Sequence, residues 1–315
     1  MRLNKIFLTM CAILLLGGSC APRPVPKLST TLREITANSG DVALYVRISG
    51  DPTSGNVIIA IHGGPGMTSD YMLSLEKLAG PDLAMVSYDQ RGVGRSSSPQ
   101  ADPDNYTLDQ YAADLEAVRQ AIEVKSVHLF GHSWGGIVAQ RYASLHPEQV
   151  RSLILMGSGP PTRAGTLACQ DAILQRIITL MEQGIISQNP DLSASGSDSF
   201  IRAYFSDPNF WFSADDLGTA PLIDEWTDQI SNLTWTANDS YDLTADLLAL
   251  NLRVLNLWGD DDPARPIASP AILAALQNAD VETVVFSHCG HFWHECPEQF
   301  FTALRYFLDL KEAEK

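Results

Sequence analysis

The pentapeptide GHSWG at 131–135 carries the residue types of a nucleophile held in a tight turn. An apolar run at 126–132 leads into it, and a helix-like segment at 135–146 follows it. A Gly-x-Ser-x-Gly turn between a strand and a helix is a nucleophile elbow, in which small flanking residues allow the turn and the serine hydroxyl projects above the sheet. The pattern predicts Ser133 as a nucleophile, and the alternative is an ordinary strand-to-helix turn.

Two later segments carry the side chains that such a serine needs. A serine hydroxyl attacks only when a base takes its proton, and the base needs an acid that orients it. Each segment follows an apolar run that we expect to form a buried strand, so both should reach the same edge of a sheet. The candidates are Asp260, Asp261 and Asp262 in the first segment and His288, His291 and His294 in the second.

Among the acids, the position in the turn favours Asp262. It directly precedes Pro263, where the chain has turned back over the sheet. Asp260 and Asp261 are also suited to capping amides within the turn itself. We therefore predict Asp262 as the orienting acid.

Among the histidines, the local sequence favours His291. It follows Gly290 in a flexible loop before an aromatic run and a helix. His288 is still close to the strand, and His294 is a rival whose alternative role is packing or capping beside the helix. The sequence therefore predicts a triad in the chain order Ser133, Asp262, His291.

The stretch HGGPG at 62–66 offers bare backbone at the end of another apolar run. Acyl transfer develops a negatively charged oxygen, and two preorganised backbone N–H groups are its usual stabilisers; loss of one costs on the order of 3 kcal/mol. The amide of Trp134, next to the nucleophile, is one predicted donor, and the amide of Gly64 is the other. The alternative is a purely structural Gly/Pro turn.

Short apolar runs alternate with helix-like segments along most of the chain. The Val, Ile and Leu content of these runs indicates strands buried on both faces, as in a parallel sheet. The alternation predicts an α/β fold with a mostly parallel, doubly wound sheet. The expected strands are 41–48, 56–62, 83–89, 126–132, 150–158, 252–259 and 281–287, and the expected helices include 107–124, 135–146 and 297–310.

The alternation fails between about 160 and 248. This segment has several amphipathic pieces and three of the six tryptophans, and it lies between two strands of sheet type. We interpret 160–248 as a helical cap inserted between two parts of one core, 40–159 and 249–315. Such a cap would cover the carboxyl ends of the strands, where α/β sheets bind ligands.

Five motifs together resemble the α/β-hydrolase superfamily and, within it, the proline iminopeptidase family of serine aminopeptidases. The resemblance covers about 40–160 and 250–312, with the motifs in the expected order. The motif DQRGVGRS (89–96) is a structural loop in that family, which implies that Arg91 and Arg95 pair with local acids instead of touching substrate. The motifs are HGGPG (62–66), DQRGVGRS (89–96), GHSWGG (131–136), WGDDDP (258–263) and CGHFWHECPEQF (289–300).

The resemblance implies an α/β-hydrolase fold with a helical cap and gives each candidate a role. Ser133 would be the nucleophile, with Asp262 and His291 as its partners. Gly64 and Trp134 would be the oxyanion donors. Acyl transfer through such a triad requires no cofactor, and we expect none.

The substrate is less well determined than the chemistry. Proline iminopeptidases usually read Gly-Gly-Ser-Trp-Gly at the elbow, where this chain has His132, and they bind the free α-amino group of the substrate with cap glutamates. Glu182 and Glu225 are the candidates for that role, and each is otherwise a solvated helix residue. We expect an aminopeptidase acting on a small molecule or short peptide. The alternatives are an esterase or lactonase and a non-catalytic binding module, and the oligomeric state stays open.

The composition argues against a nucleic-acid partner. The formal net charge is −16 and the isoelectric point about 4.7. Contacts with phosphates need a basic face, which such a chain lacks. We interpret the acidity as a solvated surface.

The first twenty residues resemble a bacterial lipoprotein signal. A basic start precedes an apolar run and a small-residue stretch ending at Cys20, which would become the lipidated first residue. Residues 21–39 would then be a tether, and the protein would be exported and held at a bacterial membrane by its lipid. The alternative is an ordinary cleaved signal with an incidental cysteine.

Three cysteines follow Cys20, and an odd number cannot form a complete disulfide framework. They are Cys169, Cys289 and Cys296. In an oxidising compartment one bridge can form, and Cys289 with Cys296 is the nearer pair. No pair has the spacing with histidines of a zinc site, so we expect no metal.

Overall fold

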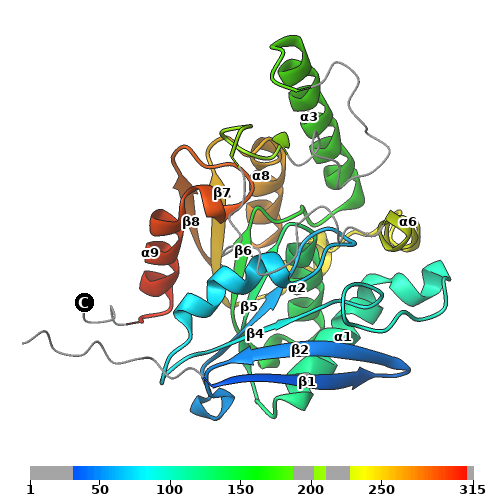
Figure 1. The fold of residues 1–315 in the computed structure, drawn as a ribbon, viewed down its shortest axis with the longest axis vertical. Coiled ribbons are helices and arrows are strands. Elements are labelled where there is room, and N and C mark those ends of the chain that lie inside the picture. The colour runs from blue at the N-terminus through cyan, green and yellow to red at the C-terminus, as the bar shows by residue number, and fades with distance from the viewer. Residues whose placement is uncertain (1–30, 187–201, 211–227, 311–315) are drawn as a thin grey trace, which may run out of the picture.

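The computed structural model describes residues 31–186, 202–210 and 228–310, and it contains a central sheet with helices on both faces (Figure 1). The strand order is β1-β2-β4-β3-β5-β6-β7-β8. Strand β2 runs antiparallel to β1 and β4, and the remaining pairs are parallel. The strands are β1 (Leu32–Ser39), β2 (Val42–Ser49), β3 (Val57–Ile61), β4 (Ala84–Tyr88), β5 (Val127–His132), β6 (Val150–Met156), β7 (Arg253–Gly259) and β8 (Asp280–Phe286).

The described helices connect these strands or cap them. Helices α3, α6 and α7 follow β6 and precede β7, and turns join or flank them in the described parts of that segment. Helix α3 extends beyond the sheet at the top of Figure 1. The helices are α1 (Leu108–Ala121), α2 (Trp134–Leu145), α3 (Arg163–Glu182), α6 (Asp228–Ala237), α7 (Thr244–Leu248), α8 (Arg265–Ala275) and α9 (Pro297–Phe307), with a 3₁₀ segment η2 (Asp70–Leu78).

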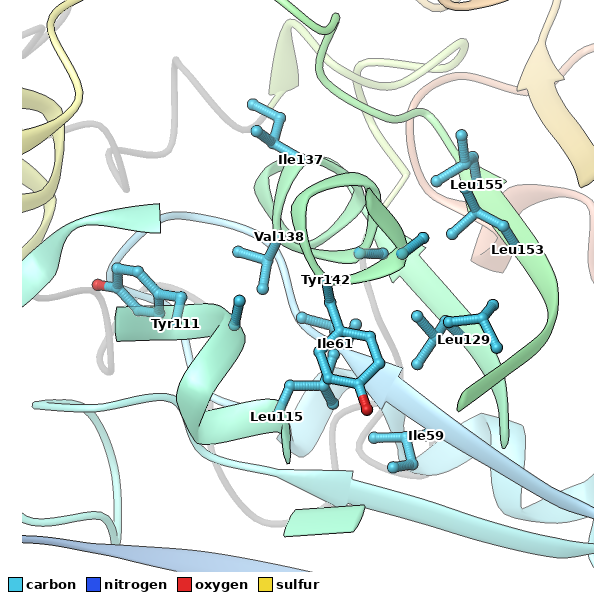
Figure 2. Close-up of a cluster of buried hydrophobic side chains, with 14 of the residues drawn as sticks. Ile59, Ile61, Tyr111, Leu115, Leu129, Ile137, Val138, Tyr142, Leu153 and Leu155 are labelled. Carbon is cyan, nitrogen blue, oxygen red and sulfur yellow. The ribbon is translucent and has the colours of Figure 1, made fainter. Parts of the chain in front are cut away.

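Alternate side chains of the inner strands supply two separate apolar layers, because successive residues of a strand point to opposite faces. On one face, Ile59 and Leu129 pack with Leu115 of α1 and Tyr142 of α2 (Figure 2). On the other face, neighbouring strand residues pack with η2 and α9. That second layer includes Ile58, Phe130 and Ile154 from the sheet, Met72 from η2 and Phe300 from α9. Strand β5, which leads into the elbow, is therefore packed on both faces by apolar side chains.

The predicted α/β fold with a mostly parallel sheet is confirmed, but two expectations about strands were wrong. Strand β8 is largely exposed, because it is an edge strand with a single neighbour. The other error concerns 32–39, expected to belong to the tether. They form β1 and pair with β2 along their whole length, from Leu32 with Ser49 to Ser39 with Val42. Their mostly exposed, polar residues hid the strand.

Helix α8 was not expected from the sequence. It contains Pro266 in its first turn and Pro270 in its interior. Proline removes a backbone donor and usually interrupts a helix, so the sequence favours a loop here. The helix forms because its apolar residues Ala268 and Ile272 are buried in the layer that also covers β7. No helix in the described ranges is long and apolar enough to cross a membrane.

Candidate active site

Ser133 has a backbone conformation that residues other than glycine rarely adopt. Its φ is 55° and its ψ is −120°, between the end of β5 and the first residue of α2. The close approach of β5 to α2 excludes side chains on both sides of the turn. A Cβ at Gly131 would lie 2.6 Å from the oxygen of Gly135, and a Cβ at Gly135 would collide with the oxygen of Ile61. The two glycines of the motif are therefore required by packing.

Asp262 and His291 form a buried pair. The Nδ1 atom of His291 lies 2.7 Å from Oδ2 of Asp262, and the two residues are 4% and 2% exposed. The other carboxylate oxygen accepts the amide of Ala264 at 2.9 Å, which fixes the plane of the group. A carboxylate can only accept, so Nδ1 carries the proton and a neutral ring leaves Nε2 as an acceptor.

The competing acids and histidines have other partners. Asp260 accepts the amide of Cys289, and Asp261 accepts the hydroxyl of Ser206. His288 is exposed, whereas Nε2 of His294 is 3.0 Å from the backbone oxygen of Tyr71. Asp262 and His291 are thus the acid and histidine that the fold brings together.

Ser133 and His291 line one cavity together with Gly64 and Trp134. Its walls come from the turn after β5, the turn after β6, and cap helices α3 and α6. Within the described part of the chain, the Ser133 hydroxyl and Nε2 of His291 have no hydrogen-bond partner. Catalytic hydrogen bonds in sites without substrate are often long and tighten only when substrate binds.

The amide of Gly64 is oriented by a buried histidine. His62 accepts the amide of Gln90 at Nε2, so its Nδ1 carries the proton and donates to the oxygen of Gly63 at 2.9 Å. Burial lowers the pKa of His62 to about 4, which keeps the ring neutral. In a trans peptide the carbonyl and the next N–H point in opposite directions. The N–H of Gly64 therefore points away from His62, and Gly64 itself lines the cavity.

Trp134 supplies the second predicted donor. Its amide belongs to the first turn of α2, where backbone N–H groups have no partner within the helix. Its indole N–H donates to Oε1 of Gln90 at 2.9 Å, and the amide nitrogen of the same Gln90 side chain donates to the oxygen of His62 at 2.7 Å. Gln90 thus ties the two candidate oxyanion segments together. Its motif is visible in the sequence, but this role is not.

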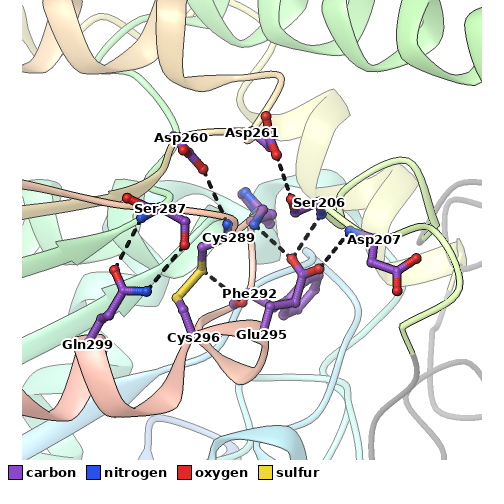
Figure 3. Close-up of a disulfide and its surroundings, with 12 residues drawn as sticks. Ser206, Asp207, Asp260, Asp261, Ser287, Cys289, Phe292, Glu295, Cys296 and Gln299 are labelled. Carbon is purple, nitrogen blue, oxygen red and sulfur yellow. Dashed lines mark hydrogen bonds between the residues drawn. A yellow bond between two sulfur atoms is a disulfide. The ribbon is translucent and has the colours of Figure 1, made fainter.

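The loop that carries His291 is anchored on both sides (Figure 3). Cys289 and Cys296 form a disulfide, the nearer pair expected from the sequence, with their Cα atoms 5.7 Å apart. Glu295 accepts the amide of Gly290 at 2.7 Å and the amide of Ser206 at 3.0 Å, so it joins the loop to the described cap segment 202–210. The residues that hold His291 in place are therefore spread over the cap and the core.

Of the two predicted amine-binding residues, the structure describes Glu182, which does not line the cavity. Glu182 is exposed at the end of α3, nine residues after Ile173, which lines the cavity. Nine helical residues span roughly 14 Å, so the Glu182 prediction is wrong, because only the first half of α3 reaches the site. Glu225 and Cys20 lie outside the described residues.

The described residues that line the cavity contain no carboxylate, lysine or arginine side chain. They include Ile137, Pro160, Ile173 and Trp235, together with the thiol of Cys169. Burial, with a smaller contribution from Asp262, raises the pKa of Cys169 to about 12, so this thiol stays neutral. In the described ranges, no three His, Cys, Asp or Glu side chains are grouped closely enough to hold a metal ion.

Known protein families and solved structures resemble this chain in sequence and in fold. Residues 56–295 match the alpha/beta hydrolase fold family. The chain belongs to that family. The hydrolase is also proline iminopeptidase-like. It is 30% identical over 269 residues to a proline iminopeptidase of Lactobacillus delbrueckii subsp. bulgaricus, covering 80% of this chain and 89% of the relative. It is 26% identical over 291 residues to one of Lactobacillus helveticus, covering 84% and 94%.

Solved structures agree on the fold of the hydrolase. A proline iminopeptidase from Mycobacterium smegmatis superposes with a TM-score of 0.70 at 22% identity, covering 88% of this chain and 98% of that one. An esterase from Exiguobacterium antarcticum superposes with a TM-score of 0.65 at 19% identity, covering 88% and 100%. The predicted family resemblance is confirmed, and the same fold occurs in relatives with different named activities.

Proposed function

We propose that the hydrolase cleaves an amide or ester bond through an acyl-enzyme on Ser133. The observation that carries the proposal is the 2.7 Å contact of His291 Nδ1 with buried Asp262, in a cavity that Ser133 also lines. This arrangement leaves Nε2 of His291 available as a base in the cavity that Ser133 also lines. It is the arrangement that serine nucleophiles use on several unrelated folds.

The proposed reaction has two halves. His291 takes the proton of Ser133 while the serine oxygen attacks the substrate carbonyl carbon, and the amides of Gly64 and Trp134 stabilise the resulting oxyanion. The protonated His291 then donates to the leaving nitrogen or oxygen. In the second half, His291 takes a proton from water, the hydroxide attacks the acyl-enzyme, and the acid is released as Ser133 regains its proton.

We propose an aminopeptidase of the proline iminopeptidase type as the first substrate reading. The named activity of the Lactobacillus relatives supports it, over 80% and 84% of this chain. Glu182 is far from the cavity and is not assigned to the free α-amine. Glu225 stays a candidate.

The cavity favours a second reading, hydrolysis of an uncharged ester or other acyl group. The described lining has no carboxylate, lysine or arginine side chain. An ammonium group placed there without a carboxylate would lose its hydration without compensation, which is costly. Such a site suits an uncharged acyl chain.

A fluorogenic substrate panel tests the proposal. It would contain prolyl and other amino-acid amides with free and blocked N-termini, and short acyl esters. We expect Ser133→Ala to abolish hydrolysis while its thermal unfolding stays that of the wild type, and retained activity would refute the role of Ser133. Cleavage limited to free-amine amides would establish the aminopeptidase, whereas ester cleavage without regard to the N-terminus would establish the acyl hydrolase.

We also propose that the hydrolase is exported and lipid-anchored through Cys20. The signal-like sequence ending at Cys20 supports this, and the disulfide of Cys289 with Cys296 suits an oxidising compartment. Cell fractionation of the wild type and Cys20→Ser tests it. We expect the wild type in the membrane fraction and the variant outside it, and equal membrane association would refute lipidation.

A further inference from the structure

A chain of buried hydrogen bonds links the three segments that build the candidate site. The amide of Gly63 donates to the Tyr71 hydroxyl at 2.7 Å, and this hydroxyl lies 2.7 Å from Nδ1 of His132. Nε2 of His132 lies 3.1 Å from the backbone oxygen of His291. The chain therefore runs from the loop with Gly64, through the residue before Ser133, to the residue predicted as the base.

The direction of each bond follows from the chemistry of the groups. The oxygen of His291 can only accept, so Nε2 of His132 must carry a proton. Burial lowers the pKa of His132 well below its usual value, so the ring is neutral and Nδ1 has a lone pair. Tyr71 therefore donates its hydroxyl proton to Nδ1. Burial also raises the pKa of the Tyr71 phenol, which keeps that proton in place.

The two side chains are enclosed and have little freedom to move. Tyr71 is 2% exposed and His132 is 0% exposed. The His132 ring lies 4.8 Å from the ring of His291 and 4.9 Å from that of Phe292, measured between centroids. A Cβ at Gly63 would lie 3.1 Å from that of Ser133, so the oxyanion loop and the elbow are already in contact.

We propose that Tyr71 and His132 are positioning residues that set the Gly63 amide, one residue before Gly64, and the His291 backbone relative to Ser133. The inference rests on the catalytic roles proposed above. Neither side chain lines the cavity, so neither touches substrate. Their effect is on geometry, and a misplacement of about 1 Å at a reacting group can cost on the order of 100-fold in rate.

Tyr71→Phe tests the link, because it removes one oxygen atom and leaves the ring in place. We expect kcat per active site to fall about tenfold while KM stays within about twofold, since the lost interaction acts on the reacting geometry and not on substrate binding. Active sites are counted by stoichiometric fluorophosphonate labelling, which removes any loss due to unfolded protein. Steady-state kinetics on the best substrate of the panel then gives both constants.

Tyr142→Phe is the matched control. Tyr142 of α2 is also fully buried, and its hydroxyl donates to Glu116 of α1 at 2.6 Å. Neither residue lines the cavity. The same atom is removed from a buried tyrosine, and we expect kcat per active site to be unchanged. Equal losses of kcat in the two variants would show a general effect of losing a buried hydroxyl and would overturn the proposal.

His132 variants test the same chain from its centre. The amide of glutamine reaches the position of Nε2, so His132→Gln keeps a donor for the His291 oxygen and loses the acceptor for Tyr71. We expect it to lower kcat by itself. The double variant Tyr71→Phe/His132→Gln should have the kcat of Tyr71→Phe within about twofold, because the bond that His132→Gln breaks, between Tyr71 and His132, is already lost in Tyr71→Phe.

Several outcomes would overturn the inference. The inference fails if Tyr71→Phe or His132→Gln has the kcat per active site of the wild type. It also fails if the fold-loss of kcat in the double variant equals the product of the two single losses. If Tyr71→Phe fails to fold, the kcat of His132→Gln decides. Failure of the proposed function itself is distinguishable, because then Ser133→Ala would remain active.

Discussion

Asp262 and Asp114 are both carboxylates shielded from solvent, and both accept hydrogen bonds from a nitrogen-bearing side chain. Asp114 binds Arg91 through both oxygens, at 2.6 and 2.7 Å, and the rest of the guanidinium is used by backbone oxygens such as that of Asn105. Asp262 binds His291 through one oxygen and an amide through the other. The Arg91 guanidinium has hydrogen-bond partners on all its nitrogens, whereas His291 leaves one ring nitrogen without a partner among the described residues and lines a cavity.

A buried carboxylate stabilises the fold when its partner is an arginine and can support catalysis when its partner is a histidine. Burial raises the pKa of Asp114, and Arg91 is the main opposing influence, so removing the arginine's charge would leave an expensive buried group. An arginine stays protonated and cannot act as a base, whereas an imidazole can. The prediction that Arg91 and Arg95 pair with local acids is confirmed, since Arg95 binds Asp89 and Asp70, each at 2.7 Å.

Asp262→Asn should give the largest effect. The asparagine cannot hold the His291 ring in the tautomer that leaves Nε2 as acceptor, so we expect kcat to fall about 10⁴-fold. The free energy of unfolding should change by only about 1 kcal/mol, because the side chains have the same size. Kinetics and urea unfolding measure both. Asp261→Asn is the control, and a comparable rate loss in it would contradict the choice of Asp262.

Asp114→Asn should reverse this pattern. It leaves the buried guanidinium of Arg91 without its counter-charge, and breaking a buried pair in this way costs about 3–5 kcal/mol. We expect that loss in urea unfolding, with kcat per active site unchanged. A large fall in kcat per site would mean that the cluster below the site also shapes the chemistry.

The pH dependence of stability extends the comparison to histidines. Both ring nitrogens of His128 are occupied, by Ser152 at 2.7 Å and Asn56 at 3.0 Å, whereas His291 keeps one for the cavity. Burial, aided by Arg151 and Arg253, lowers the pKa of His128 to about 4. Below pH 6.5 the unfolded chain takes up a proton that the folded chain refuses, so stability is lost as the pH falls from about 6.5 to about 4.

Urea unfolding of wild type and His128→Gln between pH 4 and 8 measures this loss. The variant has no imidazole at position 128 to take up a proton on unfolding. As the pH falls, its free energy of unfolding should therefore decrease less steeply than that of the wild type, and the two slopes should differ by up to about 1.4 kcal/mol per pH unit. The difference between the two proteins should be constant above pH 7 and shrink below 6.5. A constant difference over the whole range would contradict the neutral, buried state of His128.

Tyr88→Phe should give the smallest effect. The Tyr88 hydroxyl is buried and has no hydrogen-bond partner among the described residues, in contrast to that of Tyr71. Removing a buried polar group without a partner is neutral or stabilising, by up to about 1 kcal/mol. Thermal and urea unfolding measure it. A clear destabilisation would show that this hydroxyl has a partner, such as a bound water.

The sequence was most informative where neighbouring residues make the structure. The elbow was predictable because Gly131, Ser133 and Gly135 form one tight turn, and inner strands such as β3 and β6 were predictable because both of their faces are apolar. Edge strand β1 was missed because pairing with β2, and not its own composition, makes it a strand. For the second half of the site, the sequence favoured Asp262 and His291 among six acids and histidines, and the fold brings these two together.

By itself, the sequence determined the nucleophile turn, the strand-helix order and the family, because these depend on contacts within a few residues. Tertiary structure decided which acid meets which histidine and excluded Glu182 from the cavity. It also joined Tyr71 to His132 across 61 residues and His132 to His291 across 159. Such contacts exist only after the sheet has brought the ends of β3, β5 and β8 to one edge, since nothing local holds these residues together.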